Sequence, residues 1–600
     1  MRGAIETLEE RIAPAVLISA DGHRAHYIDT DGDHVSIYVS TGHLSAGNFT
    51  LAGAGAGSQL QEIDLTAKAF NKADVVVKVI KSAHGDGLAN IGYIDATGID
   101  LSSVVVKGDL GRIDAGSGGG VAIKKLDVAS IGRLGTDTQG ATASLTSNIT
   151  GALNALNVAG DIIGAYIKVS DGSNGKIESV NIRGSLIGAS GTYSGEITSS
   201  GHIGLICIGG DIEGGTGQDS GSISSFSGIH RLQIGGSIIG SSGFANATIS
   251  SFLTDASIDV IKIAGDVLGG SGIGSSQIVG GVIGQLTIGG SVIGGSGNDT
   301  AKVRSLSSIN TINIVGSVQG ASGDDSGSID GGHCNRIDIG GSLIGGSGQY
   351  SGKIWCGNLH HLAIGHNLVG GSIEGSASLY FSGSIDAGGR IDSIHIGGSI
   401  IGGTDLSSGQ LINCGNIDGL GGIGHLSVKG SVIGTNSGHG YAPVIISARG
   451  PVSGHGWTIG RITVGGRVEN VEVLAGYGMD VYEHLQPDNA SARVGFVNVS
   501  GDWIASNLVA GAQNKNYPNF GDSGDSYIRA GTGNPLAAKI ASVIIKGQVF
   551  GTPDSTNSSD HFGLVADRIG VVKVGAQTFH PTAGIQAVGE TGDVAIDQLI

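Results

Sequence analysis

One segment recurs through the central part of the sequence, mostly at intervals of 25 or 26 residues. In the copy from Ile229 to Gly240, apolar residues alternate with spacers. A Gly-Gly pair, a polar residue, two apolar residues and a glycine complete the unit. With Gly236 as the reference, equivalent points lie at Gly160, Gly184, Gly210, Gly265, Gly290, Gly316, Gly341, His366, Gly398, Gly430 and Gly466, with fainter copies at Gly108, Gly501, Gly547 and Ala576. A fixed period of this length is typical of a solenoid.

The repeat holds position by position, which indicates stacked strands. Ile, Val and Leu dominate the positions two, four and seven before the reference residue, and those two and thirteen after it. The positions three and five before it vary, and such alternation places the two sets on opposite faces of a strand. We therefore predict an all-β fold: a single-stranded right-handed parallel β-helix (β-solenoid), about 25–26 residues per coil, with longer loops towards the C-terminus. A rise of ~4.8 Å per coil gives about seventeen coils a length of roughly 80 Å.

The 113 glycines are expected at the corners between strands. Pairs such as Gly289-Gly290 and Gly340-Gly341 directly follow a strand, and glycine readily adopts the positive φ that a sharp bend needs. The runs Gly295-Ser296-Gly297 and Gly346-Ser347-Gly348 are expected to begin the next corner. The aliphatic rows argue against disorder, because a disordered chain would lack them.

Composition narrows the class of function. Aromatic residues make up 4% of the chain and charged residues 14%, so the core is expected to consist of aliphatic ladders. The net charge of −18 is spread thinly, which argues against a nucleic-acid partner because such a surface needs a basic stripe. No apolar run is long enough to span a membrane, and no clear signal peptide is present at the N-terminus.

The chain has four cysteines, Cys207, Cys334, Cys356 and Cys414. None forms a close ligand pair, which argues against zinc. Cys334 falls in an inner row and is expected to act as a small apolar filler, and Cys356 and Cys414 are expected at corners. The sequence alone leaves open whether any pair forms a disulfide.

Four segments differ in regularity. Residues 1–20 are interpreted as an N-terminal tag or cap, 21–105 as irregular entry coils with a β-hairpin, 106–470 as the regular solenoid and 471–600 as C-terminal coils with long loops. A short helix is predicted before Pro14, where it would cover the open edge of the first coil.

Three aspartates lie in the predicted hairpin at Tyr27–Val39. Two alternating segments flank an Asp/Gly turn there, which is a hairpin signal. Asp29, Asp31 and Asp33 match the first ligands of a calcium loop, but the later positions of that motif are not matched. The alternatives are a plain turn, which the mismatch favours, and a calcium site; no other cofactor is expected.

The segment Leu8–Ala15 reads Leu-Glu-Glu-Arg-Ile-Ala-Pro-Ala and resembles the N-terminal tag of large extracellular β-strand-repeat surface proteins of planctomycetes and verrucomicrobia. The hairpin and the runs Val543–Gly551 and Phe562–Gly575 resemble segments of the same family. The resemblance spans the chain and rests on structural motifs. It implies an exported or cell-surface β-solenoid, and it carries over no catalytic residue.

Long loops near the C-terminus concentrate aromatic and acidic residues. Long loops on a solenoid usually carry whatever binding there is. The candidate binding residues are Tyr517, Phe520, Asp522, Asp525 and Tyr527, with the three aromatic rings as stacking platforms for a glycan. A carbohydrate-active enzyme would need carboxylates that converge, and its candidates are Asp522, Asp525, Asp480 and Glu483, with Arg529 nearby in sequence.

These observations favour a non-enzymatic protein of the extracellular space or the cell surface. Its expected role is structural or adhesive: a component of a surface layer or fibre, or a spacer. The expected partners are further copies of the chain or cell-surface glycans. The alternatives are a polysaccharide lyase or hydrolase, and a glycan-binding adhesin that uses the C-terminal loops.

Overall fold

A computed structural model describes residues 16–53, 57–140, 143–373, 378–404, 410–437, 440–451, 456–479, 484–517, 519–529, 538–552 and 560–600. The chain is 53% strand and 2% helix, and it forms a parallel β-solenoid of about 17 turns, which confirms the predicted architecture. Residues 1–15 of the predicted tag, with the helix expected before Pro14, lie outside the described residues. Contacts divide the chain into two units, Met1–Gly236 with Asn246–Leu253, and Ser237–Ala245 with Thr254–Ile600. Each unit is described by itself.

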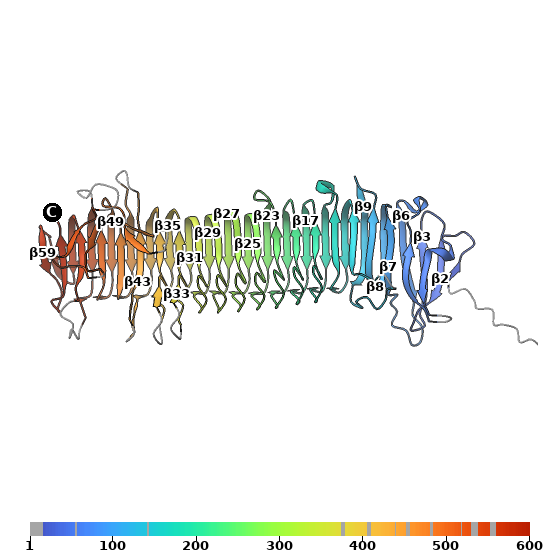
Figure 1. The fold of residues 1–600 in the computed structure, drawn as a ribbon, viewed down its shortest axis with the longest axis horizontal. Helices are drawn as coiled ribbons and strands as arrows, with labels where there is room; N and C mark the ends of the chain where they lie inside the picture. Colours follow the sequence, from blue (N-terminus) through green and yellow to red (C-terminus); the bar gives the residue numbers. More distant parts are fainter. Residues whose placement is uncertain are drawn as a thin grey trace, which may run out of the picture. The chain divides into compact units, whose positions relative to one another are not determined.

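The first unit begins with antiparallel strands and continues as parallel coils (Figure 1). Its elements are β1 (Leu17–Ile18), β2 (Arg24–Ile28), β3 (His34–Val39), η1 (Ala46–Asn48), β4 (Phe49–Ala52), β5 (Gln59–Asp64), η2 (Lys68–Phe70), β6 (Ala73–Ile80), β7 (Ile91–Thr97), β8 (Leu101–Gly116), β9 (Val121–Ile131), β10 (Thr146–Thr150), β11 (Ala152–Val158), β12 (Ile162–Ile163), β13 (Tyr166–Ser170), η3 (Gly172–Asn174), β14 (Ile177–Ile182), β15 (Leu186–Ile187), β16 (Ile197–Ser199), β17 (Ile203–Ile208), β18 (Ile212–Glu213), β19 (Ile223–Ser225), β20 (Ile229–Ile234) and β22 (Ile249–Ser251).

The predicted hairpin is present in the first unit. Strand β2 pairs antiparallel with β3, and β3 pairs antiparallel with β6. Strand β6 then pairs parallel with β8, so the antiparallel strands lead into the coils. In the coils that follow, Ile182 pairs in register with Ile208 of the next coil, and Ile208 pairs with Ile234 of the coil after that.

The second unit contains the remaining strands. They are β21 (Ile238–Ile239), β23 (Ser257–Ile263), β24 (Val267–Leu268), β25 (Ile278–Ile288), β26 (Val292–Ile293), β27 (Val303–Ile314), β28 (Val318–Gln319), β29 (Ile329–Ile339), β30 (Leu343–Ile344), β31 (Ile354–Ile364), β32 (Leu368–Val369), β33 (Ser378–Tyr380), β34 (Ile385–Ala387), β35 (Arg390–Ile396), β36 (Ile400–Ile401), β37 (Gln410–Ile412), β38 (Ile417–Gly419), β39 (Gly422–Val428), β40 (Val432–Ile433), β41 (Thr435–Ser437), β42 (Gly440–Ala442), β43 (Val444–Ala448), β44 (Ile459–Val464), β45 (Val468–Glu469), β46 (Val471–Ala475), β47 (Tyr477–Met479), β48 (Leu485–Pro487), β49 (Arg493–Val499), β50 (Trp503–Ile504), β51 (Asn507–Ala510), β52 (Ala512–Asn514), β53 (Asp525–Tyr527), β54 (Lys539–Ile545), β55 (Val549–Phe550), β56 (Phe562–Ala566), β57 (Arg568–Val574), β58 (Gln577–Phe579), β59 (Gly584–Ala587) and β60 (Val594–Gln598).

Like residues stack on like in the second unit. Ile263 pairs with Ile288, Ile288 with Ile314 and Ile314 with Ile339, and all four side chains are buried. Strands β25, β27, β29 and β31 lie side by side in successive coils (Figure 1). The inner rows predicted from the repeat are therefore the core of the solenoid, where burial of aliphatic side chains contributes roughly 25 cal/mol per Å².

A buried hydroxyl holds the corner that precedes β31. Ser351 is fully buried; its Oγ accepts the N–H of Gly346 at 3.0 Å and donates to the carbonyl of Gly348 at 2.7 Å. Tyr350 and Gly352, on either side of it, both have positive φ. The predicted corner at Gly346–Gly348 is thus confirmed.

The Gly-Gly pairs have a different reason from the predicted one. Neither Gly289-Gly290 nor Gly340-Gly341 has φ in the left-handed region, so the expected positive φ at these pairs is wrong. A Cβ on Gly341 would overlap Oγ of Ser317 in the preceding coil, and one on Gly290 would overlap a carboxylate oxygen of Asp266. Glycine leaves room there for the close approach of a neighbouring polar side chain.

The C-terminal coils carry a second apolar cluster outside the solenoid core. Strand β46 is buried on both faces, and its outward residue Leu474 packs with side chains from the loops. The buried members of this cluster are Leu474, Tyr477, Ala490, Val509, Ala512, Phe520, Ile528 and Val565. The hairpins β47–β48 and β52–β53 contribute to it, so the long loops fold back over the sheet.

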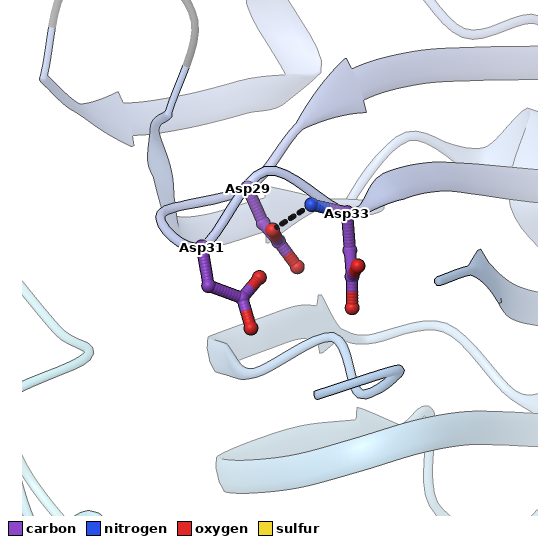
Figure 2. A group of neighbouring side chains, drawn as sticks. All are labelled: Asp29, Asp31 and Asp33. Carbon is purple, nitrogen blue, oxygen red and sulfur yellow. Dashed lines mark hydrogen bonds between the residues drawn. The ribbon is translucent and has the colours of Figure 1, made fainter. Parts of the chain in front are cut away.

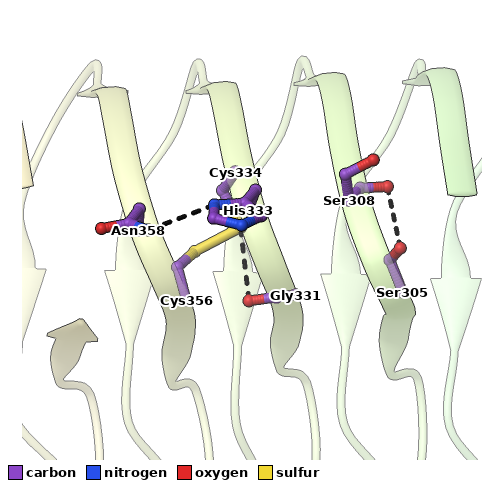
Figure 3. Close-up of a disulfide and its surroundings, with 7 residues drawn as sticks. All are labelled: Ser305, Ser308, Gly331, His333, Cys334, Cys356 and Asn358. Atoms are coloured by element: carbon purple, nitrogen blue, oxygen red, sulfur yellow. Dashed lines mark hydrogen bonds between the residues drawn. A yellow bond between two sulfur atoms is a disulfide. The ribbon is translucent and has the colours of Figure 1, made fainter. Parts of the chain in front are cut away.

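A disulfide joins Cys334 of β29 to Cys356 of β31 in the next coil (Figure 3). Both side chains are fully buried, and their Cα atoms are 6.0 Å apart. Cys334 lies in the inner row as expected, but the interpretation of it as an unbonded apolar filler is wrong. Its partner falls at a corner opposite Gly331, which has no side chain to obstruct the bond.

Candidate functional sites

The structure brings Asp29, Asp31 and Asp33 together in the turn between β2 and β3. One oxygen from each lies within 4.8 Å of the others, and Figure 2 shows the three side chains pointing to the same side of the turn. Asp29 and Asp33 are buried, whereas Asp31 is exposed. Among the residues that the structure describes, this is the one group of three acidic, histidine or cysteine side chains close enough to hold a metal ion.

Backbone N–H groups already bind four of the six carboxylate oxygens of this cluster. Asp33 accepts N–H groups from Ser82 at 2.5 Å and Gly87 at 2.6 Å, and Asp31 accepts that of Asp86 at 2.8 Å. Asp29 accepts the N–H of Asp33 at 2.7 Å. These bonds fasten the loop between β6 and β7 to the turn.

Two carboxyls of the cluster have shifted pKa values. Burial, followed by its hydrogen bond to Asp31, raises the pKa of Asp29 to about 7, and the same hydrogen bond lowers the pKa of Asp31. Oxygen ligands suit calcium, so the calcium site stays a prediction, and the contacts account for the cluster as a loop clamp.

Two of the acidic residues predicted in the C-terminal loops, Asp522 and Asp525, do converge. The side-chain amide of Asn514 in β52 donates to Asp522 and to Asp525 of β53, both at 2.7 Å. Asp525 also accepts the N–H of Gly521 at 2.7 Å and shares a hydrogen bond with Asp597 of β60. Burial raises the pKa of Asp525 to about 7. A carboxyl with a raised pKa is a candidate for acid–base catalysis, but here the same contacts brace a hairpin.

The three predicted stacking aromatics differ in exposure. Phe520 is 0% exposed and lies in the outer apolar cluster, so its ring is not available to a ligand and its role as a platform is wrong. Tyr517 and Tyr527 are 47% and 38% exposed. The Tyr517 ring meets Phe520 edge-on at 6.1 Å, and the guanidinium of Arg529 lies 5.5 Å from the Tyr527 ring. Asp480 and Glu483 lie outside the described residues.

Sequence reasoning missed a group of charged residues at β31, β34 and β38. Lys353, next to β31, forms an ion pair with Asp386 of β34, and Asp418 of β38 follows in the next coil. A small groove of about 100 Å³ adjoins Lys353 and is also lined by Trp355. The other residues of its lining are Lys302, Asp325, Ser328, Ile329 and Asp330. The spacing of the repeat places Asp386 and Asp418 in one row, and that row would have revealed that the two aspartates are neighbours.

Comparison of the chain with models of protein families, with curated proteins and with solved structures finds no match. The described part of the chain contains no helix with the length and apolar character of a membrane span.

Proposed function

We propose that the chain is a non-enzymatic structural or adhesive β-solenoid of the extracellular space or the cell surface. The observation that carries this proposal is the stack of aliphatic ladders in the second unit, joined across two coils by a buried disulfide. Such a stack resists local opening, because each coil is hydrogen-bonded to the coils before and after it. A stiff spacer or fibre component needs this property.

The disulfide supports a location outside the cytoplasm. Disulfides form and persist in oxidising compartments and are rare where thiol reductants are abundant. The resemblance of Leu8–Ala15 to the tag of large surface proteins points the same way. Surface labelling of intact cells with a membrane-impermeant reagent, together with protease shaving, tests the location. Labelling and cleavage are expected on intact cells, and protection of the protein until the cells are lysed would contradict the proposal.

The adhesive role would use the exposed rings of Tyr517 and Tyr527. Aromatic rings beside polar groups are a common platform for sugars, and both tyrosines lie near the polar cluster of Asn514, Asp522 and Asp525. A glycan array with the full chain and with the double variant Tyr517→Ala, Tyr527→Ala tests this role. Binding that survives in the double variant would show that the tyrosines are not the platform.

Light scattering at high concentration tests the expected self-association.

The second candidate is a carbohydrate-active enzyme. It is favoured by the convergence of Asp522 and Asp525 on Asn514 and by the pKa of Asp525 near 7. Product release from polyuronates and sulfated glycans distinguishes the two candidates, with Asp522→Ala and Asp525→Ala as the variants. Activity that these variants abolish would establish the enzyme and overturn the non-enzymatic proposal.

A further inference from the structure

Three side chains from successive coils of the second unit form a buried group of one lysine and two aspartates. Nζ of Lys353 lies 2.8 Å from Oδ2 of Asp386, and the two side chains are 14% and 11% exposed. Asp386 pairs in register with Asp418 one coil further on, so the backbones of the two residues are one ladder step of about 4.8 Å apart along the stack. The amine of Lys353 and the carboxyl group of Asp386 therefore come from adjacent coils and lie in contact.

Two aromatic rings lie next to Lys353, which also borders the groove lined by Lys302 and Asp325. Its Nζ lies 4.6 Å from the centre of the Phe381 ring and 5.0 Å from that of Tyr350, and the two rings stack at 5.7 Å. Ser384 donates to Oδ2 of Asp386 at 3.1 Å. Oδ1 of Asp386 is buried, and no described residue gives it a hydrogen bond. A buried charge with an unsatisfied oxygen is costly, and this cost is reduced if the group becomes neutral.

Asp418 is suited to carry a proton in this group. It is 7% exposed, and Ser447 donates to its Oδ1 at 2.6 Å. Burial, with a further contribution from the charge of Asp386, raises its pKa to about 7. One lysine cannot balance two ionised carboxyls, so the neutral form of Asp418 is favoured beside the Lys353–Asp386 pair.

We propose that Lys353 and Asp386 condense to an isopeptide bond that links two adjacent coils covalently. Nζ, once it has lost a proton, attacks Cγ of Asp386; the C–N bond forms, and the C–O bond to one carboxyl oxygen breaks. Two of the three ammonium protons leave on that oxygen as water, and the third stays on the amide nitrogen. Asp418 lends a proton to the departing oxygen and takes one back from nitrogen, so it is regenerated and no oxidant or co-reactant is needed.

The fold supplies the two conditions that this reaction needs. It holds nucleophile and electrophile together, which is worth a high effective concentration, and it shields them from water that would favour the separate acid and amine. The bond would join the coil that contains Cys356 to the coil that follows it, so the disulfide and the isopeptide bond would link three successive coils. The inference does not depend on the location or the binding role proposed above.

The chain contains its own matched control, in which Lys302 forms ion pairs with Asp299 and with Asp325. Nζ of Lys302 lies 2.9 Å and 3.4 Å from these carboxylates, and its side chain is 9% exposed. The carboxylates themselves are 45% and 42% exposed, against 11% for that of Asp386, so both are more accessible to water. We expect this pair to remain an ion pair, although its distances resemble those of Lys353–Asp386.

Mass spectrometry of the full chain, reduced and denatured, tests the proposal directly. The expected mass is one water lower than that calculated from the sequence, and an unmodified mass overturns the proposal. Trypsin should fail to cut after Lys353, giving one peptide from Ile337 to Arg390 that is lighter by one water, while it cuts normally after Lys302. A water loss that maps to any other residue also overturns the proposal.

Three variants separate the roles. Lys353→Arg and Asp386→Ala should restore the calculated mass, and persistence of the water loss in either would overturn the assignment. Asp418→Asn keeps the volume but removes the acidic proton, and freshly prepared protein should lack most of the bond. Retention of the Cys334–Cys356 disulfide in each variant shows that the coils still stack. Bond formation at the wild-type extent in Asp418→Asn would overturn the part assigned to Asp418.

Discussion

The regular coils around β27–β31 and the C-terminal coils from β43 onwards share their inner rows and differ in their outer rows. Inside, Ile329 of the regular coils corresponds to Val473 of the C-terminal ones, and both are buried. Outside, the row that holds Arg304, Asp330 and Trp355 in β27, β29 and β31 becomes Leu474, Val509 and Val565 in β46, β51 and β56.

This difference shows that different physical constraints determine the residues of the two rows. The inner row specifies a coil, because its side chains must stack on those of the neighbouring coils. The outer row instead reflects what covers the sheet: water in the regular coils, and the chain's own loops in the C-terminal ones. A change in an outer row should therefore affect the covering layer, and a change that acts between coils should affect the stack.

The largest effect is expected in the covering layer, from Phe520→Ala. Phe520 is fully buried in the outer cluster, and replacing such a ring with alanine costs about 3–5 kcal/mol. The loss should free the β52–β53 hairpin and leave the coils folded, so limited proteolysis should cut the hairpin without releasing the rest. Tyr517→Ala is the control: this ring is 47% exposed and loses its edge-on contact with Phe520, so a smaller cost of about 1 kcal/mol is expected. Global unfolding in Phe520→Ala would show that the covering layer is part of the core.

The disulfide tests the stack of the regular coils. Cys334 and Cys356 are separated by 22 residues, and a loop of this length corresponds to about 3 kcal/mol in the chain-entropy treatment. Cys356→Ser should lower the free energy of unfolding by that order, measured by guanidinium denaturation. Serine fits this corner, because Ser305 occupies the same row and donates to two carbonyls there. Cys207→Ser, at a cysteine without a disulfide, should change stability little. Equal stability of the Cys356→Ser variant and the parent would contradict the prediction.

A smaller effect is expected from a corner of the regular coils. Ser351→Ala removes a buried hydroxyl and leaves the N–H of Gly346 and the carbonyl of Gly348 without their present partner. The expected cost is about 1–3 kcal/mol, because buried groups lose a hydrogen bond without gaining water. Ser347→Ala, at an exposed serine of the same corner, is the matched control and should be close to neutral. A thermal denaturation series that ranks Ser347→Ala equal to Ser351→Ala would refute the account of the corner.

The same comparison explains what the sequence could predict. The inner rows were predictable because Ile263, Ile288 and Ile314 recur at a fixed spacing, and a period of two assigns them to one face. The hairpin at Asp29–Asp33 was predictable from alternation around a turn. The burial of Phe520 was not, because it depends on how a loop folds back; the outer row had already turned apolar at Leu474 and Val509, which was an unused signal.

Contacts across coils were harder to predict. Cys334 and Cys356 occupy different rows, so the repeat alone does not place them together; the gap that Gly331 leaves at the corner does. The positive φ of the corners was assigned to the Gly-Gly pairs, whereas it falls on residues such as Tyr350 and Gly352 that flank a buried hydroxyl. Composition identifies glycine as a corner residue, but it does not distinguish conformational freedom from close approach.

The smallest effect is a pH dependence confined to the C-terminal loops. The pKa of Asp525 is about 7 in the folded protein and about 3.9 in an unfolded chain, so the folded state holds this proton more tightly. Its contribution to stability is therefore complete below about pH 4 and is lost as the pH rises through 7. Amide hydrogen exchange in β52 and β53, corrected for the intrinsic rate, should show more protection at pH 5 than at pH 8.

Asp525→Asn sharpens this prediction, because the amide is neutral at both pH values. It should reduce the difference in protection between pH 5 and pH 8, and the remainder reports on Asp597, whose pKa is also raised by burial. Strands β29 and β31 serve as the internal reference: they lie in coils whose outer face is not covered by the C-terminal loops, and the same change of pH should alter their protection less. If protection in β29 and β31 changed as much as in β52 and β53, the titration would act on the whole stack, and the separation of covering layer from coils would fail.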